Sequence, residues 1–570
     1  MYTIQKAKQQ VLRELKQAGP KGFSPSVEEL ETPPDPLMGD LAYPCFELSK
    51  KLKRNPNEIA TEIAAKIGPK EFIASVKAIG PYVNVTLDAS GFGGSVLEEI
   101  KSRGDEYGHN SVGHEKRVMV EFANLNTHKD VHIGHLRNLF VGQAVVNLLN
   151  ASGYDVIPVA YINDLGTHVA QSIWAMKTFH SGEDLPEGDQ RIHFLRDVYV
   201  EGNKAIAEDE KLKTQVSGIF QTLEQQKKSD ELTLWKTTRK WSIDYLTKVY
   251  DELEIGLDHW YFESEVIGKT KKLIDKLIKD GVVVQSQGAW IVDLQDVDLG
   301  VNLLIKSDGT LLYNAKDLGL AYKKEEDYHS ARSVYVVDER QAHALRQLFE
   351  TLSRIGFERE LEHLSYEFVT LSDGAMGSRK GNVIRYETVR DQLLESARKE
   401  TQDRHDEWKE KQIEATTKAV AFGAMRFSML KQDIAKKIVF DFDEALSFEG
   451  FTGPYLLYTY ARIQSMLNKA GKTKSLYTAA TLVEPHSHGL LVTLSRYPEV
   501  IFQATGKMQP SVLAQYLFDL AKQFSEFYAH VPVLKAEGDA LGERLALITS
   551  VAQVMRGGMG ILGMHAIDEM

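Results

Sequence analysis

The apolar positions of the first hundred residues predict a small α/β unit. One face of a first helix carries the apolar residues Ile4, Ala7, Val11, Leu12 and Leu15. A second helix is expected over residues 56–68, followed by one strand-like segment over 76–88. The polar, glycine-containing stretch 101–117 is typical of a linker. These patterns indicate an N-terminal domain over residues 1–108.

The centre of the chain alternates between strand-like and helix-like periods. VMVEFA (118–123) and DVIPVAYI (155–162) are β-rich, and the run between them carries apolar residues at helical spacing. This βαβ pattern predicts a parallel sheet. Further strand-like runs are AWIVDL (289–294), SVYVVD (333–338) and YEFVTL (366–371). We therefore expect an α/β sheet domain over 109–444, with a helical insertion at about 175–285 and an α-helical bundle over 445–570.

Composition narrows the class of protein. The chain has 570 residues, 43% of them hydrophobic and 26% charged, as expected for a globular protein with buried cores. Its single cysteine, Cys45, excludes an internal disulfide framework and a cysteine-based structural zinc site. No signal-like or membrane-spanning apolar run is present, so we expect a cytoplasmic protein. The net charge of −12 argues against non-specific nucleic-acid binding. It does not exclude a partner that docks on a local basic surface, because net charge is an average over the whole molecule.

The segment HIGH (132–135) follows a strand and a loop and opens an apolar helix. Residues three apart on a helix are neighbours, so His132 and His135 are expected to point together from a helix N-terminus, which favours anions. Gly134 leaves room for a flat ring near the backbone. A nucleotide fits this arrangement, whereas a surface histidine pair or a histidine metal site is the alternative.

HIGH in this setting resembles the class I aminoacyl-tRNA synthetases and is similar to the related nucleotidyltransferases. Five longer segments resemble the arginyl-tRNA synthetases in particular: residues 120–138, 161–173, 312–322, 334–349 and 450–463. The resemblance covers nearly the whole chain. It implies a Rossmann-like catalytic domain, an N-terminal domain that reads the tRNA D-loop, and a DALR-type anticodon-binding domain at the C-terminus.

The second motif of the synthetases, KMSKS, is altered here. The corresponding stretch is AMGSRKGN (375–382), in which Ala375, Gly377 and Ser378 replace the first Lys, the first Ser and the second Lys. The arginyl enzymes often have such a form, with a lysine just before HIGH, and Lys129 stands there. By resemblance, Lys129, Lys380 and Arg379 share the catalytic charge with the two histidines. ATP contacts are implied for His132, Gly134, His135, Lys129, Met376, Ser378 and Lys380.

Acidic and aromatic residues in the resembling segments suit an arginine substrate. Glu121 is a carboxylate in an apolar strand, and Asp317 lies four residues after Tyr313. A guanidinium is planar, stacks on rings and binds carboxylates through two donors at once. The resemblance implies arginine contacts from Glu121, Asn126, Tyr313, Asp317 and Gln341. A solvated strand face for Glu121, or ordinary packing for Tyr313 and Gln341, is the alternative.

The resemblance also implies the reaction and the partners. The carboxylate of L-arginine would attack the α-phosphorus of ATP, and the arginyl group would pass to tRNA(Arg), with Mg²⁺ arriving with ATP. No dedicated metal site is expected, and the chain is expected to be a monomer. The implied tRNA contacts are Tyr82, Asn84, Tyr455, Tyr458, Arg462 and Met570, although Tyr82 and the TGPYL segment could instead serve packing.

Two rival functions remain at this level. A small-molecule nucleotidyltransferase shares HIGH-type chemistry but needs neither a D-loop-reading domain nor a helical tail. A synthetase-derived RNA-binding protein without activity would account for the altered AMGSRKGN segment, but the intact HIGH segment and the acidic residues oppose it.

Overall fold

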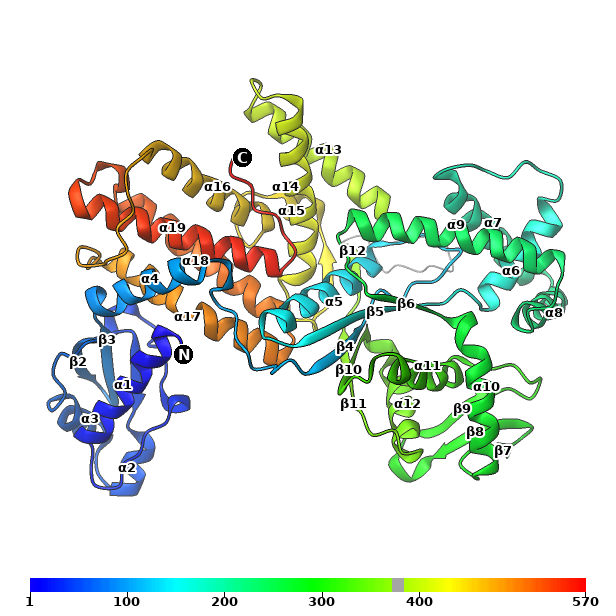
Figure 1. Ribbon diagram of the computed structural model, residues 1–570, viewed down its shortest axis with the longest axis horizontal. Coiled ribbons are helices and arrows are strands. Elements are labelled where there is room, and N and C mark those ends of the chain that lie inside the picture. Colours follow the sequence, from blue (N-terminus) through cyan, green and yellow to red (C-terminus); the bar gives the residue numbers. More distant parts are fainter. Residues whose placement is uncertain (372–383) are drawn as a thin grey trace. The chain divides into compact units, whose positions relative to one another are not determined.

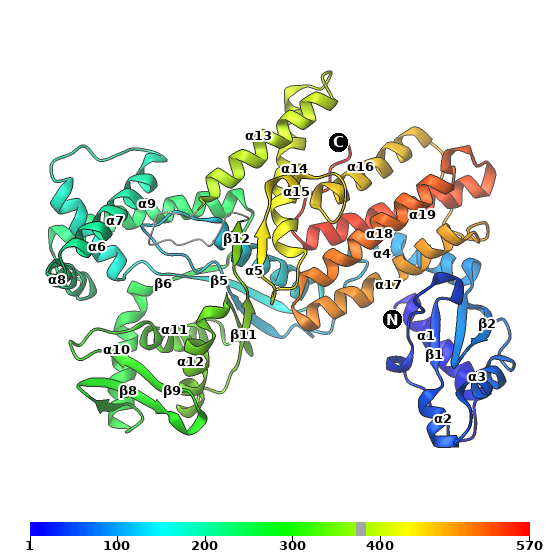
Figure 2. The ribbon, with the colours of Figure 1, turned by 180° about the vertical axis from the view of Figure 1, so that it is seen from behind.

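The computed structural model describes residues 1–371 and 384–570, which divide into two compact units (Figures 1 and 2). The first unit contains residues 1–110, 448–506 and 512–570, and the second contains 111–447 and 507–511. The N-terminal residues and the C-terminal helices thus belong to one unit, and the sheet domain forms the other.

A parallel sheet forms the centre of the second unit. Its strand order is β11-β10-β4-β5-β6, and every neighbouring pair is parallel. The strands are β4 (Arg117–Glu121), β5 (Asp155–Ile162), β6 (His259–Phe262), β10 (Arg332–Asp338) and β11 (Glu360–Tyr366). Helix α5 (Ile133–Ala151) connects β4 to β5. The predicted α/β class and its βαβ unit are confirmed.

Helices cover both faces of this sheet. Helix α5 packs across β4, β5 and β10. On the other face, Met119 and Val159 form a core with Val266 of α10 (Glu263–Lys279) and Leu320 of α11 (Tyr313–Tyr328). Because successive strand residues alternate between faces, Glu121 points to the same face as Met119. The alternation therefore directs this carboxylate toward α11.

Helices stand between β5 and β6 in the sequence, as expected for an insertion. They are α6 (Thr167–Phe179), α7 (Gln190–Glu208), α8 (Leu212–Glu224) and α9 (Asp230–Glu252). The expected range 175–285 also contains β6 and α10, which belong to the sheet and its cover. The predicted strand 289–294 is β8 (Ala289–Leu294), but it pairs antiparallel with β7 (Val284–Ser286) and β9 (Gly300–Ile305) in a separate sheet beside α12 (Ala342–Arg354).

The predicted strand 366–371 is wrong as a single element. Strand β11 ends at Tyr366, and β12 (Val369–Leu371) pairs in parallel with β13 (Ile438–Phe440). The backbone N–H of Glu367 donates to the carbonyl of Ile434 at 2.9 Å, so the chain leaves the main sheet at this point. The helices after this region are α13 (Tyr386–Arg404), α14 (Glu410–Leu430) and α15 (Phe442–Leu446).

The first unit combines an antiparallel sheet with a helical bundle. The sheet has the order β1-β3-β2, from β1 (Leu41–Pro44), β2 (Ile73–Ile79) and β3 (Tyr82–Leu87), with helices α1 (Thr3–Ala18), α2 (Phe46–Leu52), α3 (Pro56–Ala64) and α4 (Gly94–Arg103). The single strand expected over 76–88 is therefore wrong. Gly80, at φ +57°, turns the chain into a hairpin, a conformation that suits glycine.

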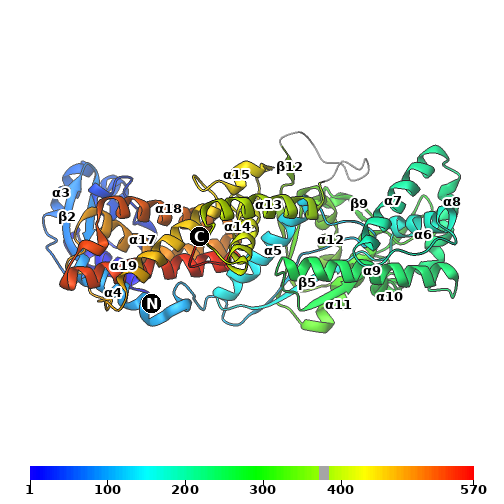
Figure 3. The ribbon, with the colours of Figure 1, turned by 90° about the horizontal axis from the view of Figure 1, so that it is seen from above.

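The predicted C-terminal bundle is confirmed. Figures 1 and 3 show α16 (Gly453–Ala470), α17 (Pro485–Lys507), α18 (Pro510–His530) and α19 (Gly538–Ile561) side by side. The N-terminal residues pack on these helices: the Tyr107 hydroxyl donates to the Leu494 carbonyl at 3.1 Å, and Asp40 Oδ2 lies 2.9 Å from His488 Nε2. No helix among the described residues combines the length and apolar character that crossing a membrane requires.

Candidate active site

The two histidines of HIGH lie together at the start of α5. His132 is the N-cap residue, and its backbone N–H donates to His135 Nδ1 at 3.1 Å. The two rings stack with centroids 3.5 Å apart and planes 21° from parallel. Within the part of the chain that the structure describes, the buried His132 Nδ1 has no hydrogen-bond partner. The helix N-terminus therefore presents a pair of imidazoles, as the spacing predicts.

Both imidazoles are neutral at physiological pH. Burial, together with Lys129 and Arg340, lowers the pKa of His132 to about 4. Burial, His132 and Lys129 hold the pKa of His135 well below its usual value. Neutral imidazoles can hydrogen-bond a phosphate oxygen but supply no positive charge.

Lys129 supplies the positive charge beside the histidines. Among the described residues, its ammonium has no carboxylate partner; it lies 4.9 Å from the ring centroid of Tyr199 on α7. The neighbouring acid, Asp130, is instead held by Arg196 of α7, at 3.3 Å. The loop thus retains a cation that no acidic side chain of the described chain neutralises, which suits a phosphate.

Gly134 lies against the ring of His132. A Cβ at this position would lie 3.1 Å from the ring of His132, closer than nearly all real contacts. The glycine therefore makes room for the neighbouring imidazole itself.

Helix α9 holds the loop before HIGH in place. His128, fully buried at φ +61°, places Nε2 2.8 Å from Thr238 Oγ1, and its backbone N–H donates to Ser242 Oγ at 3.0 Å. The Val131 N–H donates to the Tyr245 hydroxyl at 3.1 Å. Sequence reasoning missed these contacts. The spacing of Thr238, Ser242 and Tyr245 on one helical face was the available signal.

The residues assigned to the lysine-bearing loop, Met376, Ser378, Arg379 and Lys380, lie outside the described residues. The described chain resumes beside HIGH. Ile133 N–H donates to the Ile384 carbonyl at 3.1 Å, and Tyr386 N–H donates to the Val131 carbonyl at 2.9 Å. The C-terminal flank of AMGSRKGN therefore runs antiparallel to the first residues of HIGH.

Glu121 is buried and already has partners. Its carboxylate forms an ion pair with Lys324 of α11 and accepts a hydrogen bond from Asn124 Nδ2 at 2.7 Å. Only 4% of Glu121 is exposed, so the solvated strand face considered above is excluded. Lys324 was not identified from the sequence, because a lysine on a helix is usually exposed.

Asp317 differs from the other acids around it. Glu121 pairs with Lys324, Glu263 pairs with Lys316, and Asp164 pairs with Arg239. The carboxylate of Asp317 has no hydrogen bond or ion pair with any described residue. Burial and the charges of Glu121 and Glu263 raise the pKa of Asp317 to about 8. An acid in this state gains from a cationic ligand, which would relieve both effects.

The other residues assigned to arginine are near the same strand ends or more exposed. Asn126 forms an isolated bridge with Asn163, which follows β5. Tyr313 is the first residue of α11 and is 55% exposed. Gln341 is exposed between β10 and α12.

The buried atoms Tyr161 Oη and Glu263 Oε2, near Asp317, lack partners within the described chain. The charges of Glu263, Asp317 and Glu121 all raise the pKa of Tyr161, after burial, so this hydroxyl lies among the acids. Buried polar groups are normally hydrogen-bonded, and unpaired ones at the carboxyl edge of a parallel sheet are typical of a ligand site.

The residues assigned to tRNA lie in the first unit. Tyr82 packs edge-to-face on the exposed Phe46, and Asn84 is 5% exposed. On α16, Tyr455 Oη lies 3.1 Å from Ser525 Oγ, and the Arg462 guanidinium lies over the Tyr458 ring at 4.6 Å. Met570 is the last residue, partly exposed.

Models of known protein families match three parts of the chain. A family model described as tRNA synthetases class I (R), catalytic domain, matches residues 97–442; an arginyl tRNA synthetase N terminal domain model matches 5–87, and a DALR anticodon binding domain model matches 456–570.

Relatives match along almost the whole chain. An arginine–tRNA ligase of Bdellovibrio bacteriovorus is 36% identical, over 95% of this chain and 94% of the relative, and one of Halothermothrix orenii is 33% identical, over 96% and 97%. The structure of the Thermus thermophilus arginyl-tRNA synthetase superposes with a TM-score of 0.80 at 26% identity, covering 99% of this chain and all of that one. The resemblance seen in the motifs is confirmed, and the chain belongs to the arginyl-tRNA synthetase family of class I aminoacyl-tRNA synthetases.

Proposed function

We propose that this chain activates L-arginine with ATP and transfers the arginyl group to the 3′-terminal adenosine of tRNA(Arg). One observation supports this substrate above all others: among the described residues, Asp317 is an acid without a cationic partner, whereas the neighbouring acids each have one. A site with one unpaired negative charge suits a ligand with one positive charge.

The cation that fits best is a guanidinium. Its planar group can pair with the Asp317 carboxylate through two hydrogen bonds while stacking near Tyr313 at the start of α11. Glu121, Asn126 and Gln341 would contact the rest of the amino acid. A lysine ammonium would leave acceptors unpaired, and unpaired buried groups discriminate strongly against a substrate.

The nucleotide would bind at the start of α5. His132 and His135, being neutral, would hydrogen-bond phosphate oxygens, and Lys129 would offset their negative charge. Gly134 leaves room for the ring of His132. We assign further ATP contacts to Met376, Ser378, Lys380 and Arg379.

Two transfers complete the reaction. An oxygen of the arginine carboxylate bonds to the α-phosphorus while the bond to the β-phosphate oxygen breaks, giving arginyl-adenylate and pyrophosphate. A ribose hydroxyl of the tRNA then attacks the arginyl carbonyl, loses its proton and releases AMP. No protein nucleophile is needed, so positioning and charge stabilisation account for catalysis.

Mg²⁺ would be held by the phosphates of ATP, since Mg²⁺ commonly binds through substrate phosphates. Among residues 1–371 and 384–570, no group of three or more His, Cys, Asp or Glu side chains could hold a metal ion. The ion would neutralise phosphate charge beside Lys129.

For tRNA, we propose contacts from Tyr82 and Asn84 to the D-loop and from Tyr455, Tyr458, Arg462 and Met570 near the anticodon. Aromatic and guanidinium planes can stack on unpaired bases. The enzyme would act as a cytoplasmic monomer.

A charging assay tests the proposal. The chain should attach radiolabelled arginine, and not lysine, to bulk tRNA in the presence of ATP and Mg²⁺. Pyrophosphate exchange, run with and without tRNA, would show whether activation needs bound tRNA. Adenylyl transfer to a small molecule without charging would favour a nucleotidyltransferase, and tRNA binding without either reaction would favour an inactive RNA-binding protein.

A further inference from the structure

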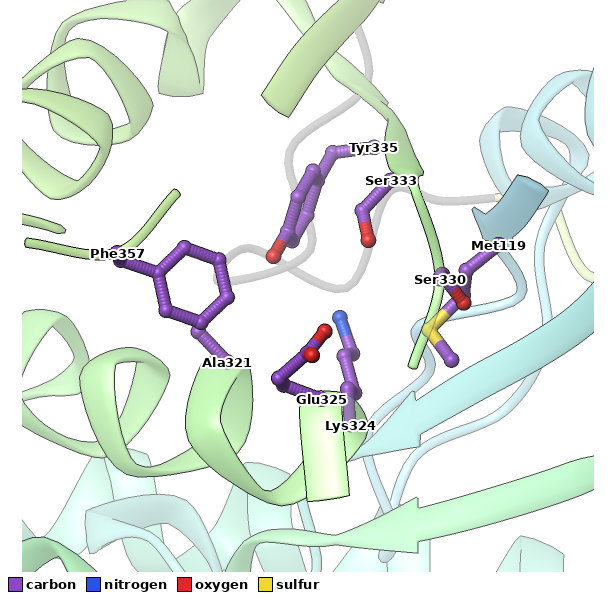
Figure 4. Close-up of a pocket in the computed structure, with 8 residues that line it drawn as sticks. All are labelled: Met119, Ala321, Lys324, Glu325, Ser330, Ser333, Tyr335 and Phe357. Carbon is purple, nitrogen blue, oxygen red and sulfur yellow. The ribbon is translucent and has the colours of Figure 1, made fainter. Parts of the chain in front are cut away.

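Lys324 is a buried lysine that the reaction described above does not use. It lies on α11, seven residues after Asp317 and so on the same face of the helix. Its side chain is 3% exposed, its ammonium contacts the Glu121 carboxylate, and the Tyr335 ring centroid lies 4.3 Å away. Figure 4 shows its side chain pointing toward Tyr335 and Ser333, beside a cavity of about 10 Å³ that leaves little room for a larger group.

With every carboxyl group ionised, the charges around Lys324 add up to one net negative charge. Glu121, Glu263 and Asp317 contribute three carboxylates, and Lys324 and Lys316 contribute two ammonium groups. Each lysine is paired with one glutamate, so Asp317 carries the remaining charge. Without Lys324, the cluster would contain two unpaired carboxylates, and such neighbours do not both ionise readily.

Stability alone does not explain this lysine. Replacing a buried ion pair by apolar side chains of similar size is often neutral or stabilising, so such a pair is weak evidence for a contribution to folding. The Glu121–Lys324 ion pair is distinguished by its position, because it joins the end of β4, where Glu121 lies, to α11, the helix that carries Asp317.

We propose that Lys324 is a positioning residue of the arginine pocket: it holds the Glu121 carboxylate in place and leaves the pocket one negative charge, which selects a ligand with a single positive charge. This inference rests on the proposed function. Lys324 does not touch the reacting atoms; it acts through Glu121 and Asp317.

The titratable groups that face Lys324 come from several elements. They are Glu121 of β4, Tyr335 of β10, and Asp317 and Glu325 of α11, while Glu263, Lys316 and Tyr161 face Asp317. Removing the ammonium would raise the pKa values of the remaining carboxyl groups, because a neighbouring positive charge is lost. These carboxyl groups would then stay protonated up to a higher pH, and arginine binding would require the loss of a proton from them over that wider pH range.

The test compares Lys324→Met with the wild type in the arginine KM, measured by aminoacylation from pH 6 to 9. We expect the KM at pH 7 to rise tenfold or more, while kcat at saturating arginine stays within about threefold. We also expect the pH below which KM rises to move upward from about 8, so that the KM of the variant still falls between pH 8 and 9, where the wild-type KM levels off. A purely structural defect would raise KM at every pH without moving this inflection, and that result would overturn the proposal.

Two further variants keep the result interpretable. Lys323→Met changes the adjacent lysine, which is 34% exposed and pairs with Asp327, and it should behave as the wild type. The double variant Glu121→Gln/Lys324→Met removes both members of the buried pair, so it leaves no uncompensated charge and restores the net charge of the pocket. The inflection in the pH dependence of its arginine KM should return toward that of the wild type even if Lys324→Met alone folds poorly.

An unmoved inflection in Lys324→Met, or a shifted inflection in the double variant, would overturn the assignment of Lys324. A wild-type chain that does not charge tRNA with arginine would overturn the proposed function itself.

Discussion

Two helix starts in the sheet unit carry the candidate chemistry, and their electrostatics are opposite. The start of α5 presents two neutral imidazoles and Lys129, a cation that no described carboxylate pairs with. The first turns of α11 present Asp317, an acid with no cationic partner in the described chain, and burial and neighbouring carboxylates raise its pKa to about 8. One suits a polyphosphate and the other suits a cationic side chain.

The difference shows that the number of charged residues does not define a site. The α11 region holds more charges than the α5 region, but most of them are paired with each other. Among the residues that the structure describes, the charges that remain unpaired are Lys129 at α5 and Asp317 at α11, and they define the ligand that each region can accept. Four experiments can break or sharpen this comparison.

The largest effect is expected at α11. Asp317→Asn keeps the shape of the side chain but removes its charge, so kcat/KM for arginine should fall roughly 10³-fold, the scale for losing one partner of a buried charged pair. Asp327→Asn, on the same helix but in an ion pair with Lys323, is the matched control and should change kcat/KM little. A near-normal value for Asp317→Asn would remove this residue from the substrate site.

The next effect is expected at α5. His135→Ala removes an imidazole that would bind the charge developing on the phosphates, so the rate of adenylate formation should fall about 10²-fold or more. The arginine KM should change much less, because the residue belongs to the other half of the site. His329→Ala, an exposed histidine at the end of α11, serves as the control in a single-turnover assay. Normal single-turnover rates for His135→Ala would refute the assigned role.

A smaller effect is expected in the pH dependence of the arginine KM, which concerns the α11 region and not the α5 region. A guanidinium pairs with Asp317 only when this group is ionised, and its pKa in the free protein is about 8. The arginine KM should therefore fall about tenfold for each unit of rising pH below pH 8 and level off above it. An arginine KM that is flat between pH 6 and 8 would contradict a raised pKa at Asp317.

The smallest expected effect concerns the histidines. The pKa of His132 is about 4 and burial holds the pKa of His135 well below its usual range, so both imidazoles stay neutral near neutral pH. With both substrates saturating, kcat should vary by less than about twofold between pH 6 and 8, since bound arginine keeps Asp317 ionised. An inflection in kcat near pH 6.5, the usual histidine value, would show that an imidazole of the site titrates.

Local patterns predicted the elements around the site but not their pairing. The βαβ unit around HIGH was evident because an apolar helix stands between two β-rich runs. The segment 76–88 was expected as one strand, although Gly80 and Pro81 mark the turn of a hairpin. The strand 289–294 was found, but its partner strands are antiparallel and belong to a separate sheet. The periodicity of apolar residues indicates which face of an element is buried, but it does not indicate which strand pairs with it.

The candidate site shows the same division. His132, His135, Lys129 and Asp317 were chosen from the sequence, because residue type and spacing carry the chemistry. Lys324, His128 and the hydroxyls of α9 were missed, since they act through residues that lie about one hundred or more positions away.

By itself, the sequence determined the fold class, the family and the side chains available to each half of the site, because these depend on residue type and local spacing. The tertiary structure alone decided which charges cancel and which remain. Burial removes solvent and the fold brings distant groups together, and these two effects set the neutral state of His132 and His135 and leave Asp317 without a partner among the described residues.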